Sequence, residues 1–249
     1  HFLYCVEYAR VFYRRSTDEG ATWGKAVEIT AALEPLRKTY AWQVVATGPG
    51  HGLETTKGRL IVPVWLSTGA GSGAHRPSIV STLASDDGGK SWKAGAVVAD
   101  ETDPLRNPNE TTVAELPDGR IMLNIRHESK TRRRAISTSK DGLSGWSTPV
   151  LDEALPDPVC MGSLLNVGKT LYFSNLHSTS GRVNLGLRRS DDAGKTWKEV
   201  TRLHKGPAAY SDLAASPDGR TLWCVYECGD GKDPYRRLML TRLELKKDK

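Results

Sequence analysis

The chain has 249 residues, of which 38% are hydrophobic and 26% are charged, and it carries a net charge of +6. This composition is that of a globular protein with a substantial core, and no apolar run approaches the roughly 18 residues that a transmembrane helix needs. The densest basic run, "HESKTRRRA" at 127–135, contains no aromatic residue. Because nucleic-acid sites usually combine basic and aromatic side chains, neither a nucleic-acid partner nor a membrane span is expected.

The sequence opens on "HFLYCVEY" and has no initiating methionine. We therefore expect the chain to be a fragment or a processed product that lacks a front portion. This leaves the compartment open, and a secreted, periplasmic or lysosome-like location would each fit.

One eight-residue pattern, Ser-x-Asp-x-Gly-x-Ser/Thr-Trp, recurs along the chain. It appears as "STDEGATW" at 16–23, "SDDGGKSW" at 85–92 and "SDDAGKTW" at 190–197, with a degenerate copy, "SKDGLSGW", at 139–146. The Asp can accept bonds from nearby amides, the Gly permits positive φ, and the Ser/Thr hydroxyls close local bonds. The pattern therefore predicts a self-bonded hairpin turn with a structural role, which we call an Asp turn.

Strand-like runs flank every Asp turn, and glycine turns such as "LPDGR" and "SPDGR" alternate with them. The Asp turns begin at 16, 85, 139 and 190, a spacing typical of four-stranded propeller blades. About four complete blades are expected, over 44–92, 110–146, 158–197 and 209–246, after the back half of another at 1–25. No convincing helical period is found, since "AALEPLRK" at 31–38 is short and broken by Pro35. The prediction is an all-β chain.

The four cysteines lie at 5, 160, 224 and 228, and no second Cys/His pair has zinc-ligand spacing. Cys224 and Cys228 fall on one expected strand, where residues four apart share a face but stand too far apart to bond. We expect buried free thiols, no metal site and no cofactor.

The eight-residue pattern resembles the Asp-box, or BNR repeat, of bacterial-type exo-α-sialidases (neuraminidases). Segments such as "ATGPGHGLETTKGRLIVPVW", "NPNETTVAELPDGRIMLNIR" and "GPAAYSDLAASPDGR" extend this resemblance along nearly all of residues 1–249. It implies a single six-bladed β-propeller domain whose first blade and part of the second are missing from this chain. It also implies a retaining glycoside hydrolase that removes terminal sialic acid from sialylated glycans.

The resemblance assigns roles to four residues. Tyr210 matches the nucleophile, Glu110 matches the glutamate that activates it, and Arg126 and Arg182 match two arginines that bind the substrate carboxylate. Guanidinium groups suit a carboxylate because they offer a planar, permanently charged pair of donors. Without the resemblance, the arginines could be surface ion-pairing residues and Tyr210 a core aromatic.

Two further points stay open. Glu115 lies on the same expected strand as Glu110 and competes with it for the activating role. His51, Glu54 and Arg76 lie on loops that could border the pocket and contact substrate.

Two elements of the family are absent from the sequence: the Arg-Ile-Pro motif with the first triad arginine, and the acid/base aspartate that follows it. Arg10 and Glu7 are weak substitutes. We therefore expect this chain alone to be weakly active or inactive, because losing a general acid costs ~10²–10⁴ in rate.

Two non-enzymatic alternatives are a sialoside-binding propeller and a receptor propeller without a sugar site. A trans-sialidase or a 2-keto-3-deoxy sugar hydrolase would use the same residues. Linkage preference and oligomeric state are not set by the sequence.

Overall fold

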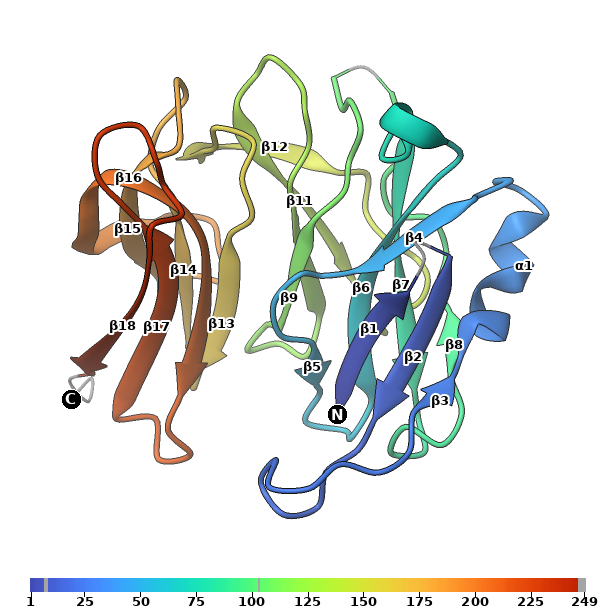
Figure 1. Ribbon diagram of the computed structural model, residues 1–249. Helices are drawn as coiled ribbons and strands as arrows, with labels where there is room; N and C mark the ends of the chain where they lie inside the picture. Colours follow the sequence, from blue (N-terminus) through green and yellow to red (C-terminus); the bar gives the residue numbers. More distant parts are fainter. Residues whose placement is uncertain (7–8, 103, 246–249) are drawn as a thin grey trace.

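The computed structural model describes residues 1–6, 9–102 and 104–245, and the chain in these ranges is built almost entirely of antiparallel strands (Figure 1). The sheets follow one another around an arc in chain order, as blades of a propeller do (Figure 1). The all-β, propeller-like prediction is therefore confirmed. None of the helices in the described ranges is long and apolar enough to cross a bilayer.

The first sheet has three strands and the second has five. The first contains β1 (Phe2–Val6), β2 (Arg10–Arg14) and β3 (Val27–Glu28). The second contains β4 (Val44–Thr47), β5 (Leu53–Glu54), β6 (Leu60–Ser67), β7 (Ser78–Ser85) and β8 (Lys93–Ala94).

The third sheet is a four-stranded blade and the fourth combines two blades. The third contains β9 (Thr111–Glu115), β10 (Ile121–Ile125), β11 (Arg133–Ser139) and β12 (Val150–Pro156). The fourth contains β13 (Ser163–Val167), β14 (Thr170–Leu176), β15 (Val183–Ser190), β16 (Lys198–Ala215), β17 (Thr221–Cys228) and β18 (Arg237–Glu244). Its two halves share β16, whose first part pairs with β15 and whose last part pairs with β17.

The segment for which no helix was predicted does form short helical turns, so that prediction was wrong in detail. A 3-10 turn, η1 (Thr30–Leu33), runs into α1 (Glu34–Arg37), and a second 3-10 turn, η2 (Gly71–Gly73), precedes β7. Pro35 lies in the first turn of α1, where a missing amide costs no intrahelical bond. Proline therefore opens this helix and does not break it.

The core is divided among the spaces between successive sheets. Along β10, Ile121 and Leu123 pack towards β4, β6 and β7, whereas Met122 packs the other way, against β13 and β14. Because successive strand side chains point to opposite faces, a strand buried on both sides is apolar throughout. This explains the continuous apolar runs of the sequence.

The Asp turns bond internally as predicted. In the turn at 190–197, Thr196 N and Oγ1 donate to the Asp192 carboxylate at 2.9 and 2.6 Å, and Gly194 N donates to Ser190 Oγ at 2.8 Å. The turns at 16–23 and 85–92 repeat these bonds. The glycine of each of these three turns has φ between +85° and +89°, a conformation that disfavours side chains with a Cβ.

The cysteines of β17, Cys224 and Cys228, are buried and free, as expected, and so is Cys160. Cys5 differs, because it is only partly buried.

Candidate active site

Glu110 and Arg126 are brought together by the hairpin of β9 and β10. Ile125 pairs with Thr111, and one step further Arg126 N donates to the Glu110 carbonyl oxygen at 3.0 Å. Directly paired residues project from the same face of an antiparallel ladder. The two side chains consequently meet, with Arg126 Nη1 3.2 Å from Glu110 Oε2 and only 12% and 15% of the side chains exposed.

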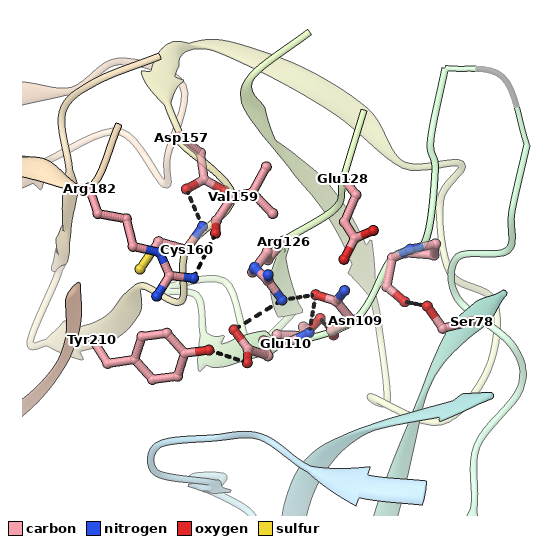
Figure 2. A network of polar contacts seen from close by, with 12 residues as sticks. Ser78, Asn109, Glu110, Arg126, Glu128, Asp157, Val159, Cys160, Arg182 and Tyr210 are labelled. Atoms are coloured by element: carbon pink, nitrogen blue, oxygen red, sulfur yellow. Dashed lines mark hydrogen bonds and ion pairs between the residues drawn. The ribbon is translucent and has the colours of Figure 1, made fainter. Parts of the chain in front are cut away.

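Asn109 fixes this pair. Its Oδ1 accepts from Arg126 Nη1 at 2.7 Å and from the Glu110 amide at 2.8 Å (Figure 2). The buried Arg126 Nε has no hydrogen-bond partner among the described residues. Asn109 thus orients the Arg126 guanidinium through Nη1, and Arg126 Nε remains available as a hydrogen-bond donor.

Tyr210 reaches this pair from a sheet more distant in sequence. Its hydroxyl donates a hydrogen bond to Glu110 Oε1 (Figure 2). The register of β16 and β17 shifts between Ala208 and Ser211, so Tyr210 lies in a β-bulge, and its amide donates to the Glu227 carboxylate at 3.1 Å. Bulges redirect side chains and are frequent beside active sites.

Burial, followed by the negative charge of Glu110, raises the pKa of Tyr210 well above its usual range. The phenol therefore stays protonated at neutral pH, with Glu110 as the acceptor of its proton.

Arg182 approaches Tyr210 from the start of β15. Its carbonyl oxygen accepts from the Ala208 amide at 3.0 Å, and its guanidinium lies 5.5 Å from the centre of the Tyr210 ring. Arg182 Nη1 donates to Tyr235 Oη at 2.5 Å and Nη2 donates to the Val159 carbonyl at 3.2 Å. Figure 2 shows Glu110, Arg126, Arg182 and Tyr210 arranged around one space.

Val159 adopts an unusual backbone conformation to accept this bond. Its φ of +67° is strained for a β-branched residue, at a cost of about 1–3 kcal/mol. Beneath it, the fully buried Arg134 donates to the Cys160 carbonyl at 2.8 Å and to Asp157 at 3.2 Å, and so stabilises the 157–160 turn. Arg134 therefore helps to hold the Val159 carbonyl in the position where it accepts from Arg182.

The remaining predicted residues lie outside this group. Glu115 turns away and accepts from Thr56 N and Oγ1 at 2.7 and 2.8 Å. Arg76 forms a two-point ion pair with Glu128 at 2.6 and 2.9 Å, while Glu54 is exposed on β5. His51 forms hydrogen bonds with the Asp212 carboxylate and the Leu164 carbonyl oxygen.

Of the two weak substitutes, Arg10 pairs with Glu28 at 2.6 Å, and Glu7 lies outside the described residues.

Sequence reasoning missed Asn109, Tyr235 and the Arg134–Asp157 pair. Asn109 stands next to Glu110 in "NPNET", so adjacency was a usable signal. Tyr235 lies 53 residues from Arg182 in a loop without any recognised motif, and only the fold joins them.

Comparisons with known proteins identify the family of the chain. The family model for a BNR repeat-like domain matches residues 5–222. A sialidase of Micromonospora viridifaciens is 32% identical over 87% of this chain and 33% of its own length. A sialidase of Bacteroides fragilis is 33% identical over 88% of this chain and 39% of its own length.

Among solved structures, a Hadza microbial sialidase superposes with a TM-score of 0.78 at 27% identity, covering 95% of this chain and 44% of that one. A leech intramolecular trans-sialidase, solved with 2,7-anhydro-Neu5Ac, gives a TM-score of 0.71 at 23% identity over 94% of this chain and 36% of its own. The chain thus spans about a third to two fifths of the length of the two bacterial relatives it matches.

Proposed function

The chain belongs to the BNR repeat-like family that includes bacterial-type sialidases, and from this premise we propose that it carries most of the active site of a retaining exo-α-sialidase. The observation that supports this most directly is the hydrogen bond from the Tyr210 hydroxyl to Glu110, flanked by two guanidinium groups. The substrate class is a terminal sialic acid on a glycoconjugate.

The substrate explains the choice of these residue types. Sialic acid carries an ionised carboxylate on its anomeric carbon, which would repel an aspartate or glutamate nucleophile; sialidases use tyrosine instead. Arg126 and Arg182 supply positive charge on either side of Tyr210, and both retain donors for a carboxylate. Substrate binding replaces the Arg182–Tyr235 contact or adds to it.

In the first step, Tyr210 Oη attacks the anomeric carbon as its proton passes to Glu110 Oε1. The bond to the leaving oxygen breaks, and that oxygen must collect a proton from an acid. In the second step, water attacks the same carbon and gives one proton to the conjugate base of the acid that protonated the leaving oxygen. The bond from the sugar to Tyr210 Oη breaks, and Glu110 returns its proton to that oxygen. Two displacements at the same carbon give retention of configuration.

We infer that these 249 residues alone hydrolyse natural sialosides weakly. They contain no Arg-Ile-Pro motif and no match to the aspartate that follows it. An aryl sialoside is a suitable first substrate, because its leaving group is a weak base and departs without a proton donor.

The test is to trap the glycosyl-tyrosine. The chain would be incubated with 3-fluorosialosyl fluoride, whose electron-poor ring slows the second step, and then digested and analysed by mass spectrometry. We expect one added 3-fluorosialosyl group on the peptide containing Tyr210, and none in Tyr210→Phe. Sialoside binding without a label would favour the non-catalytic binding propeller, and a label elsewhere would refute the assigned nucleophile.

A further inference from the structure

His51 lies between β4 and β5 and makes two hydrogen bonds to the fourth sheet. Its Nδ1 is 2.7 Å from Asp212 Oδ1 on β16, and its Nε2 is 3.2 Å from the Leu164 carbonyl oxygen on β13. Only 26% of the imidazole is exposed. One side chain therefore contacts β13 and β16, each more than a hundred residues away from it in sequence.

Both partners of the ring can only accept. A backbone carbonyl never donates, and the Asp212 Oδ1 already accepts from Ser163 Oγ at 2.7 Å and from the Leu213 amide at 3.1 Å. A neutral imidazole has a single N–H and can satisfy only one of the two. Both hydrogen bonds can form at the same time only when both ring nitrogens of His51 carry protons.

The surrounding charges favour that protonated form. Burial alone would lower the pKa of His51, but the hydrogen bond and the charge of Asp212 outweigh it and raise the pKa above its usual value. Although burial also opposes ionisation of Asp212, the bond from His51 holds the pKa of that carboxyl below its usual range.

The Cys224 thiol of β17 also interacts electrostatically with Asp212. Burial raises the pKa of this thiol to about 12, so it stays neutral.

Asp212 lies two residues after Tyr210 on β16, directly beyond the bulge that contains Tyr210. On the opposite side of His51, the Leu164 amide donates to Thr112 Oγ1 at 3.1 Å, and Thr112 belongs to β9, directly after Glu110 and Thr111. Thr112, Leu164, His51 and Asp212 thus connect the strand that follows Glu110 with the strand that carries Tyr210.

We propose that His51, in its doubly protonated form, is a positioning residue that holds the β16 segment of Tyr210 at a fixed distance from Glu110. The positioning role rests on the proposed function, since the group being positioned is the proposed nucleophile. The consequence is pH-dependent: the connection is intact below the pKa of His51 and loses one of its bonds as the pH rises through that pKa.

The protonation state can be measured without any activity. In ¹⁵N-histidine-labelled protein, both ring nitrogens of His51, assigned with His51→Asn, are expected to remain protonated above pH ~6.5, the ordinary histidine pKa. The buried His127 is an internal contrast, because burial first, and then Arg134, lowers its pKa to about 4. A His51 ring that is neutral at pH 6 would overturn the proposal, whatever the enzyme does.

Kinetics on an aryl sialoside then test the positioning role. We expect His51→Ala to lower kcat about 10- to 100-fold with little change in KM, the size of effect that a misplaced reactive group produces. His51→Asn keeps one donor for Asp212 and cannot titrate, so it should recover part of kcat and lose the alkaline limb of the wild-type pH profile. His177→Asn is the matched control, since His177 lies 4.0 Å from Glu199 on the first half of β16, away from this connection.

The two proposals fail in different ways. If the wild-type chain forms no glycosyl-tyrosine and hydrolyses nothing, the proposed function fails while the NMR titration still decides the protonation state of His51. If hydrolysis occurs and His51→Ala matches the wild type in kcat and pH profile, the positioning role is refuted and the sialidase assignment stands.

Discussion

The Asp turns and the Tyr210 group are both dense in polar side chains, but they are assembled over very different distances along the chain. In the turn at 190–197 the groups that donate hydrogen bonds to the Asp192 carboxylate lie within four residues of it. In the candidate site, the bond between Tyr210 and Glu110 spans 100 residues, and that between Arg182 and Tyr235 spans 53. One region is a local structure that repeats, while the other exists only when several sheets are in place.

The two regions also differ in what their polar groups leave unused. The Asp turns pair their hydroxyl, amide and carboxylate groups internally. In the site, by contrast, the buried Arg126 Nε has no hydrogen-bond partner within the described part of the chain, and Val159 has a strained positive φ. Unsatisfied and strained groups are costly and are concentrated where ligands bind. Substitutions in the two regions should therefore separate activity from stability.

The largest effect is expected from Tyr210→Phe. Removing the hydroxyl removes the proposed attacking oxygen, so kcat on an aryl sialoside should fall by at least ~10²–10⁴-fold. The melting temperature should change little, because the ring still packs against the Arg182 guanidinium. A variant that turned over at the wild-type rate would contradict the assignment of the nucleophile.

The second-largest effect is expected from Glu110→Gln, which keeps the shape of the side chain and removes the proposed base. We expect kcat to fall by about 10²–10⁴-fold. Glu115→Gln is the control on the same strand: it weakens the bonds to Thr56 and should lower thermal stability while leaving kcat intact. If the two variants exchanged these outcomes, Glu115 would be the activating residue.

Arg182→Lys tests the role of the guanidinium. Lysine keeps the charge but cannot form the planar two-point contact with a carboxylate, so kcat/KM should fall about 10- to 100-fold, as expected for one lost charge-assisted bond. Tyr235→Phe removes only the hydroxyl that contacts Arg182 Nη1, and should change kcat/KM less than tenfold. Equal losses in both variants would mean that Tyr235 contacts substrate itself.

The smallest effect is expected in the Asp turns. Asp192→Asn weakens the bonds to Thr196 and should lower the melting temperature by about 2–4 °C without changing kcat. Asp18→Asn should cost less, because the Trp of its turn, Trp23, is 44% exposed, whereas Trp197 packs against Phe173. A fall in kcat at unchanged stability in either variant would give the turns a functional role.

The same turns set an acid limit on stability. The Thr22 hydroxyl first, then its amide and the Ser16 hydroxyl, lower the pKa of Asp18 to about 2. These hydrogen bonds therefore stabilise the fold fully above pH ~4, the pKa of an aspartate in the unfolded chain, and their contribution is lost as the pH falls towards 2. Thermal melts from pH 5 to 2 should show a shallower decline in Asp18→Asn than in the wild type.

The sequence by itself determined the local structure. The alternation of Asp turns and glycine turns predicted the strands, the blade spacing and the internal bonding of the turns, because each depends on residues within about eight positions. The resemblance of the flanking segments to a known family also selected Tyr210, Glu110, Arg126 and Arg182 as candidate site residues. Pro35 misled the analysis, because its effect on a helix depends on its place in the turn.

Only the tertiary structure decided which of these side chains meet. The contacts of Glu110 with Tyr210 and of Glu115 with Thr56 follow from which sheets face each end of β9. The hydrogen bonds of His51 to β13 and β16 depend on how successive sheets pack. The hydrogen bond of Arg182 to Tyr235 depends on the loop before β18. Spacing along a strand fixes the face on which a side chain projects, but the neighbour across that face is determined by how successive sheets pack against one another.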